Sequence, residues 1–265
     1  MKDAKTRTAG SKEHSDIDII DVKAGVEALN DEVAEEVRGL LRAHKVFMIN
    51  LMGSPGAGKT SVILRTIAAL SDRYRIAVME ADVDSDVDAA AVAAAGAQSL
   101  QLHTGGSCHM DAKMTLRGLE AIGLGDGQPR DRAPQDHGAQ GRVPEDNRPR
   151  IVILENVGNL VCPAEFDVGA DLKVMILSVP EGDDKPLKYP LMFKVSDLLL
   201  INKTDTAQIF DFDLNKCAEN VSLCHPGMEI IPLSAKTGEG FETWIEWLDR
   251  RIREWAEGIR GDGQS

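Results

Sequence analysis

The segment GSPGAGKTS at residues 53–61 combines glycines, one lysine and one threonine in a fixed order. Glycines carry no Cβ, so consecutive backbone N–H groups can converge on a cluster of oxygens. Lys59 would reach the β- and γ-phosphates of a nucleotide, and Thr60 would ligate Mg²⁺. A chance glycine turn is the competing interpretation, but an apolar strand-like run precedes the segment and a helical pattern follows it. We therefore predict nucleoside triphosphate binding by Gly53, Ser54, Pro55, Gly56, Ala57, Gly58, Lys59, Thr60 and Ser61.

The segment Asn202-Lys-Thr-Asp205 follows a buried type of strand and indicates which base is bound. A carboxylate at Asp205 can accept two hydrogen bonds from the N1–H and N2–H₂ groups of guanine. Adenine lacks that donor pair and would leave the carboxylate unpaired. Asn202 would support the loop, and the stem of Lys203 would cover the base. A second segment is similar to the other base-contacting loop of GTPases, namely Ser234, Ala235 and Lys236.

Two acidic residues end predicted strands on the same edge as the phosphate-binding segment. They are Asp82 and Glu155, and oxygen ligands of this kind suit Mg²⁺. Glu155-Asn-Val-Gly158 looks like the E/D-x-x-G switch that senses a γ-phosphate. We predict that Lys59, Asp82 and Glu155 are catalytic and that Thr60, Asp82 and Glu155 hold Mg²⁺ or its water. We expect the neighbouring acids only to cap the next helix; these are Asp84, Asp86 and Asp88.

Thiols and an imidazole form a third candidate site. Cys108 and His109 lie at a predicted helix start, and Cys162 lies seven residues past Glu155. These ligand types suit Ni²⁺ or Zn²⁺. Three ligands leave a tetrahedral ion one short, which predicts an open site or one shared between two subunits. On spacing alone, buried core cysteines beside a surface histidine are an equally good interpretation, and for Cys217, Cys224 and His225 we prefer it.

Composition limits the functions that are possible. The chain has 265 residues and a formal net charge of −13, which disfavours nucleic acid and anionic membranes as partners. No apolar stretch reaches the roughly 20 residues of a membrane span. The N-terminus has no apolar signal core, and the four cysteines show no disulfide framework, so we expect a cytoplasmic protein.

Alternating strand and helix patterns predict the fold class. We expect an α/β P-loop NTPase with a mostly parallel, doubly wound sheet and helices on both faces. Residues 1–29 are predicted to be a largely disordered tail, and residues 30–260 a single G domain with a flexible insertion at 123–150. The expected strands are 46–52, 75–82, 99–103, 151–154, 172–179, 198–201 and 229–233. The expected helices are one capped by Asn30, then 59–70, 86–96, 109–122 and a C-terminal helix that contains Trp244 and Trp247.

The motifs together resemble the HypB family of hydrogenase-maturation nickel-insertion GTPases. The resemblance is carried by NLMGSPGAGKTS, TGGSCHMDAKM, ILENVGNLVCPAEFD, LSVPEGDDKPLKYPLMF, INKTD and LSAKTGEG. It implies slow GTP hydrolysis, a homodimer when GTP is bound, and nickel delivery to the hydrogenase large subunit alongside a nickel-binding accessory protein. It places the metal site on Cys108, His109 and Cys162. It also places a nucleotide-responsive switch at Asp183, Asp184 and Lys185.

The chain departs from the family at several positions. Its first 30 residues contain no cysteine and only His14, so a high-affinity nickel store is not expected. Ala91 stands where the family often has arginine, and TGGSCHM replaces TGKGCHL. A urease-accessory or other metallochaperone GTPase is the nearest rival, although its Cys-Pro-His metal pair is not found. A metal-free regulatory switch GTPase and an ATP-dependent kinase are the more distant rivals.

Overall fold

A computed structural model describes residues 22–81, 91–124 and 148–262 of the chain. A seven-stranded sheet forms its centre, and all adjacent strands pair in parallel in the order β3-β2-β4-β1-β5-β6-β7. The strands are β1 (Val46–Gly53), β2 (Arg75–Glu80), β3 (Gln98–Gln101), β4 (Arg150–Glu155), β5 (Leu172–Ser178), β6 (Leu198–Asn202) and β7 (Glu229–Pro232). The predicted fold class is confirmed.

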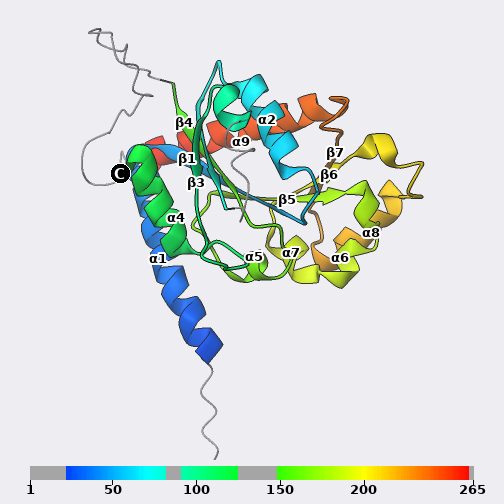
Figure 1. Cartoon of the computed structure of the whole chain (residues 1–265), viewed down its shortest axis with the longest axis horizontal. Coiled ribbons are helices and arrows are strands. Elements are labelled where there is room, and N and C mark those ends of the chain that lie inside the picture. The colour runs from blue at the N-terminus through cyan, green and yellow to red at the C-terminus, as the bar shows by residue number, and fades with distance from the viewer. Residues whose placement is uncertain (1–21, 82–90, 125–147, 263–265) are drawn as a thin grey trace, which may run out of the picture.

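Helices cover both faces of the sheet (Figure 1). They are α1 (Val22–His44), α2 (Lys59–Leu70), α4 (Ala112–Leu119), α5 (Cys162–Glu165), α6 (Lys185–Lys188), α7 (Pro190–Val195), α8 (Leu214–Cys224) and α9 (Phe241–Asp262). Side chains alternate along a strand, so Ile49 and Leu51 of β1 pack under α2 and α9. Met48 of the same strand packs with α1 and α4 on the opposite face. Strands buried on both sides explain the nearly continuous apolar runs in the sequence.

The first helix begins at Val22, eight residues before its expected cap and inside the predicted tail. The cap prediction for Asn30 is therefore wrong. The Asn30 side chain instead joins two other segments, since Nδ2 donates to Asp167 O at 2.7 Å and Oδ1 accepts from Ala112 N at 2.9 Å. A long-range role of this kind leaves no local sequence signal. Residues 1–21 lie outside the described part of the chain.

The helix expected over 109–122 begins only at Ala112. Asp111 caps it by accepting a hydrogen bond from Met114 N at 2.7 Å, and a π-helical turn continues it from Glu120 to Leu124. Cys108 and His109 therefore lie in a loop rather than in a helix. Of the helix expected over 86–96, only the end from residue 91 is described, and nearly all of the insertion at 123–150 falls outside the described residues.

Strand direction brings the predicted sites to one edge of the sheet. Leu51 of β1 pairs with Glu155 at the end of β4, while Gly53 pairs with Ile176 of β5. The chain leaves β1 between its two neighbours at the point where the strand order reverses, and ligands of open α/β sheets bind there. Among the described residues, no helix is long and apolar enough to cross a membrane.

Candidate functional site

The phosphate loop, residues 53–61, connects β1 to α2 and needs its glycines. Gly56 and Gly58 have φ angles of 74° and 95°, which favour glycine. A Cβ on Gly58 would lie 2.4 Å from Asn202 Nδ2, and one on Gly53 would lie 2.6 Å from Ile176 O. The loop therefore packs too tightly against β5 and β6 for any other residue at these two positions.

Lys59 and Thr60 open α2 and face the phosphate loop and β4. Lys59 is buried, and its Nζ lies 3.5 Å from Ser54 O, so the ammonium is held over the loop. The Thr60 hydroxyl donates to Glu155 at 3.1 Å to Oε1 and 3.4 Å to Oε2. A hydroxyl beside a buried carboxylate is an oxygen set that fits Mg²⁺. Asp82, the other predicted ligand, lies outside the described residues, as do Asp84, Asp86 and Asp88.

The base loop, residues 202–205, is tied to the phosphate loop. Asn202 Nδ2 donates to Ala57 O at 2.9 Å, and its Oδ1 accepts from Ala235 N at 3.0 Å. Lys203 adopts a left-handed φ of 65°, and its Nζ donates to Gly56 O at 2.6 Å. These contacts fix the base loop relative to the loop that would hold the phosphates.

Asp205 is oriented by the second base-contacting segment, because Ser234 Oγ donates to its Oδ1 at 2.7 Å. Residues 234–236 are in turn tied to α2: Arg65 Nε donates to Ala235 O, and Arg65 Nη2 donates to Lys236 O at 2.9 Å. The structure thus brings together both segments that the sequence predicts to contact a guanine.

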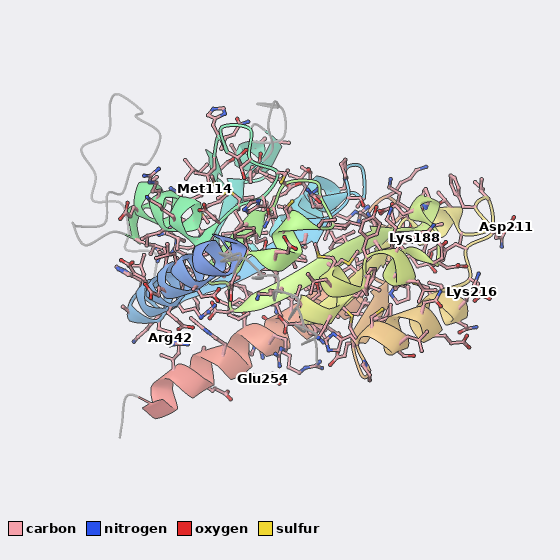
Figure 2. All side chains as sticks on the ribbon, turned by 90° about the horizontal axis from the view of Figure 1, so that it is seen from below. Arg42, Met114, Lys188, Asp211, Lys216 and Glu254 are labelled. Atoms are coloured by element: carbon pink, nitrogen blue, oxygen red, sulfur yellow. The ribbon has the colours of Figure 1, made fainter. Side chains whose placement is uncertain are left out.

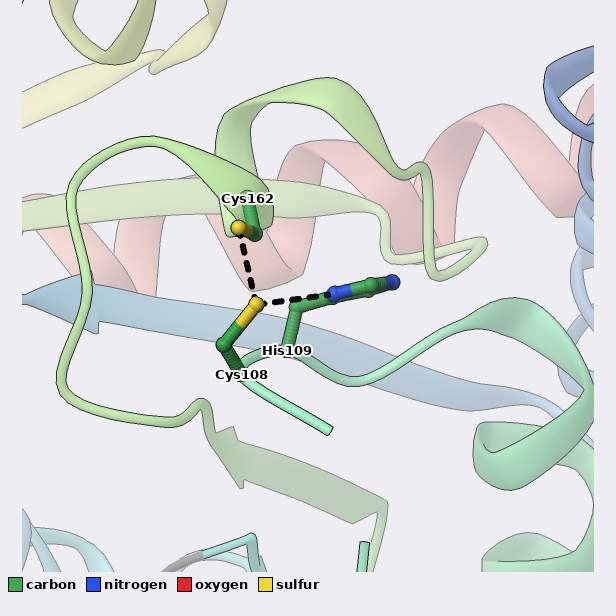
Figure 3. A group of neighbouring side chains, drawn as sticks. All are labelled: Cys108, His109 and Cys162. Carbon is green, nitrogen blue, oxygen red and sulfur yellow. Dashed lines mark hydrogen bonds between the residues drawn. The ribbon is translucent and has the colours of Figure 1, made fainter. Parts of the chain in front are cut away.

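The three predicted metal ligands converge, although 54 residues separate the two cysteines (Figure 3). Their candidate ligand atoms all lie within 4.8 Å of one another, and within the described chain this is the only such group of three. Cys108 Sγ lies 2.8 Å from Cys162 Sγ and 3.7 Å from His109 Nδ1. Cys108 is exposed and the other two are half-buried, so the set opens toward solvent. Two thiols and an imidazole in this arrangement match the donors that Ni²⁺ and Zn²⁺ take.

The surroundings of His109 and Cys162 set their protonation. The His109 ring stacks on Phe166 with centroids 4.0 Å apart and an interplanar angle of 19°. Burial lowers the pKa of His109 below its usual 6.5, which favours the neutral imidazole that binds metal. The hydrogen bond with Cys108, followed by burial, raises the pKa of the Cys162 thiol. Metal binding by this thiol would therefore release a proton.

The switch segment, residues 155–162, contains two asparagines that we did not single out from the sequence. Asn156 is 1% exposed and hydrogen-bonds both to Asn50 of β1 and to the backbone of Met110. Asn159 forms an isolated bridge with Gly53 and donates to Cys108 O at 3.4 Å. A signal did exist, because an asparagine inside the apolar run 46–52 has to find a polar partner.

The other cysteines behave as core residues. Cys217 is fully buried, and burial raises its pKa to about 12. Cys224 Sγ donates to Pro186 O at 3.4 Å, and His225 Nδ1 lies 3.0 Å from Phe193 O. These partners support the interpretation we preferred from the sequence.

The predicted switch at 183–185 rests on α8 and α6 at one end of the molecule. Asp183 pairs with Lys216 at 3.1 Å, and Asp184 pairs with Lys188 at 2.7 Å. Lys185 Nζ lies 3.7 Å from Glu181 Oε1. Figure 2 shows Lys188 and Lys216 at the end of the molecule away from Met114 of α4. The segment is thus distant from the α4 side of the molecule.

Comparison with known proteins identifies the family. Residues 47–232 match the model of the CobW/HypB/UreG nucleotide-binding domain. The hydrogenase maturation factor HypB of Azotobacter vinelandii is 40% identical over 222 residues, which cover 84% of this chain and 66% of that protein. The chain belongs to the HypB family. It therefore has a P-loop nucleotide-binding domain, as the sequence predicts.

Solved HypB structures agree with this assignment. HypB from Archaeoglobus fulgidus superposes with a TM-score of 0.72 at 35% identity, covering 85% of this chain and 99% of that one. HypB from Helicobacter pylori in complex with nickel gives a TM-score of 0.69 at 30% identity, and the match covers 85% of this chain and 96% of that one. The shared region thus spans nearly the whole of both solved chains.

Proposed function

We propose that this protein is a GTP-hydrolysing metallochaperone that delivers nickel during hydrogenase maturation. The observation that carries the proposal is the continuity of the switch segment: Glu155 accepts a hydrogen bond from Thr60, and Cys162 at the other end touches Cys108. One short piece of chain therefore contacts both a candidate nucleotide site and a candidate metal site. The names of the HypB relatives and the nickel complex of the H. pylori protein support the same conclusion.

The nucleotide half of the function follows from the phosphate and base loops. The backbone N–H groups of residues 53–61, except Pro55, and the Lys59 ammonium bind the phosphates, and Asp205 selects guanine. Thr60 and Glu155 would hold Mg²⁺, with Asp82 as a further ligand, and the ion would neutralise charge on the β- and γ-phosphates. Glu155 would also orient the attacking water. We propose that turnover is slow, as the resemblance to the HypB family implies.

The metal half follows from the cysteine and histidine set. Cys108, His109 and Cys162 take nickel as cargo, or zinc in its place. An ion with three protein ligands keeps an open position, which suits release more than permanent structural binding. A γ-phosphate that orders the switch segment would shift Cys162, so hydrolysis would change the metal affinity.

Dimerisation in the GTP state is part of the proposal. Of the eight large apolar side chains that are exposed in the described chain, six lie between Leu187 and Leu223, around α6, α7 and α8. Exposed apolar groups of this kind can contribute to an association surface. We propose a homodimer that GTP stabilises, and a nickel-binding accessory protein and the hydrogenase large subunit as further partners. A cytoplasmic location stays a prediction.

Two competing functions differ at the metal site. The family model also covers UreG proteins, so a urease-accessory role is the nearer competitor, and the HypB names of the relatives favour hydrogenase. A metal-free regulatory GTPase would use its cysteines as core residues. The exposed position of Cys108 and its contact with Cys162 favour metal binding over that role.

A metal titration tests the proposal. Nickel affinity is measured by competition with a chromogenic chelator in the presence of GDP and of a non-hydrolysable GTP analogue, and subunit association is followed by light scattering. We expect different affinities in the two states and association in the analogue state. Equal affinities would rule out the coupling. Displacement of the bound analogue by excess ATP as readily as by excess GTP would rule out guanine selection.

A further inference from the structure

Asn156 directly follows Glu155, and its backbone is fixed in the sheet. Its N–H donates to Leu51 O at 3.0 Å, which continues the β1–β4 pairing beyond the last residue of β4. The side chain is almost fully buried. A buried carboxamide needs partners for both its oxygen and its nitrogen, so its contacts define what it holds in place.

The carboxamide makes three hydrogen bonds. Its Oδ1 accepts from Met110 N at 3.1 Å and from Val157 N at 2.9 Å, and its Nδ2 donates to Asn50 Oδ1 at 3.1 Å. Two backbone N–H groups can face only the oxygen, so they determine which way the amide points. The side chain thus connects β1, the switch segment and the chain beside the metal ligands.

Met110 is the anchor of the metal loop, residues 107–110. Its side chain is fully buried in the apolar cluster that contains Met79 and Leu154. Because Cys108 and His109 immediately precede it, a displacement of the Met110 backbone changes where both ligands lie. The hydrogen bond that Met110 N donates to Asn156 Oδ1 therefore lies one residue from His109 of the metal set, which is Cys108, His109 and Cys162.

The switch segment also touches the phosphate loop. A Cβ on Gly158 would lie 2.9 Å from Pro55 Cγ, and Asn159 bridges to Gly53. The second link to the metal loop, from Asn159 Nδ2 to Cys108 O, is longer at 3.4 Å and exposed. The buried Asn156 contact is the shorter and drier of the two, and a hydrogen bond away from water is harder to replace.

We infer that Asn156 is the positioning residue through which the nucleotide state of the switch segment reaches the metal loop. This inference rests on the proposed function, since it requires a metal site that responds to nucleotide. Cys162 is attached to the switch segment covalently, and Cys108 and His109 are attached to it through Asn156 and Met110. Both halves of the metal set are therefore linked to one segment.

Asn30 supplies a matched control. It is also a buried asparagine, and its Oδ1 also accepts from the backbone just after the metal loop, at Ala112 N. Its other partner is Asp167 O, so it joins that chain to a different segment from the switch. Asn30→Ala therefore removes a comparable buried amide without cutting the path from Glu155.

The test compares nickel affinity with GDP and with a non-hydrolysable GTP analogue in wild type, Asn156→Ala and Asn30→Ala. The quantity compared is the ratio of the nickel affinities in the two nucleotide states. We expect this ratio to lie closer to one in Asn156→Ala than in wild type, by a factor of about five or more. In Asn30→Ala the ratio should stay within about twofold of the wild-type ratio. Asn156→Asp retains the acceptor for Met110 and Val157 and should keep most of the ratio. An Asn156→Ala protein with the wild-type ratio would overturn the inference. If that variant does not fold, Asn156→Ser replaces it and the same ratio decides.

Amide hydrogen exchange gives a second readout without metal. The analogue should change protection of the peptide containing Met110 in wild type and in Asn30→Ala, and leave it unchanged in Asn156→Ala. A wild-type protein with equal affinities and equal protection in both nucleotide states would defeat the proposed coupling and this inference together. If nickel affinity and amide protection change with the nucleotide state equally in wild type and in Asn156→Ala, only this inference is contradicted.

Discussion

The phosphate loop is held mainly by its own backbone and by the two strands beside it, whereas the metal loop is held by side chains from distant parts of the chain. Gly53 and Gly58 lie too close to β5 and β6 for a Cβ, so the phosphate loop packs directly against both strands. The metal loop depends on Asn156 and on the Phe166 ring under His109. The difference teaches that the nucleotide site is built from local backbone, whereas the metal site depends on contacts between segments that are distant in the sequence.

Removing the lysine of the phosphate loop should give the largest effect. We expect Lys59→Ala to reduce GTP hydrolysis by about 100- to 1,000-fold, because the buried ammonium would no longer stabilise charge on the phosphates. Nickel affinity without nucleotide should stay within about threefold of wild type, since Lys59 is not a member of the metal set. Phosphate release and chelator competition measure the two quantities. Lys113→Ala, on the exposed side of α4, is the control and should keep both activities. If Lys59→Ala lost nickel affinity as strongly as it loses GTP hydrolysis, the two sites would not be separate.

Removing a thiol tests whether the metal site can be lost while the nucleotide site is kept. Cys162→Ser should weaken nickel binding by about 100-fold, because a hydroxyl is a poor substitute for a thiolate with this ion. GTP affinity should change by less than about threefold, since the phosphate loop keeps its backbone contacts. Isothermal titration with each ligand gives the result. Cys224→Ser, whose thiol donates to Pro186 O, should bind nickel as wild type does; a matching loss there would argue against the assigned ligand set.

The base loop offers a sharper test of the nucleotide site. Asp205→Asn leaves one acceptor for guanine and adds a donor, so GTP affinity should fall by about 100-fold. Xanthine carries an oxygen where guanine has its amino group, so xanthosine triphosphate should bind the variant better than GTP. Competition against a fluorescent nucleotide measures both. The exposed Asp211→Asn is the control, and an unchanged GTP preference in Asp205→Asn would remove this residue from the base site.

The smallest expected effect concerns the ion pairs that support the chain after Phe166. Burial alone would raise the pKa of Asp167, but Lys173, the Gly169 N–H and Arg38 outweigh it and hold the pKa below 3.8. The carboxylate therefore adds stability above pH 3.8 that is lost as the pH falls through its folded pKa. Asp167→Asn should lower the free energy of unfolding by about 1 kcal/mol at pH 7.

The difference between Asp167→Asn and wild type should shrink as the pH falls below 3.8 and through the lowered folded pKa, because the wild-type carboxyl then becomes protonated. Thermal unfolding from pH 7 downward measures it. A constant difference over that range would show that the ion pairs with Arg38 and Lys173 are not its source.

The sequence predicted the strands, the parallel α/β fold and the nucleotide motifs because each depends on local residue order. Gly53 to Thr60 run from the end of β1 into the first turn of α2, and Asn202 to Asp205 begin at the last residue of β6. Their spacing along the chain is therefore close to their spacing in space. The start of α1 was missed by eight residues, because asparagine is a common capping residue and the buried role of Asn30 is set by the distant Asp167 and Ala112.

The residues near each cysteine in the sequence could not decide whether the cysteines bind metal or lie in the core, since Cys108 and Cys162 are 54 positions apart. Only the tertiary structure decided that they meet, because β3 and β4 flank β2 and the loops after parallel strands leave the same edge of the sheet. The same holds for Asn156, whose partners on β1 and beside His109 are distant in sequence. Residue types along the chain thus determine which chemistry is possible, and strand order determines which residues perform it together.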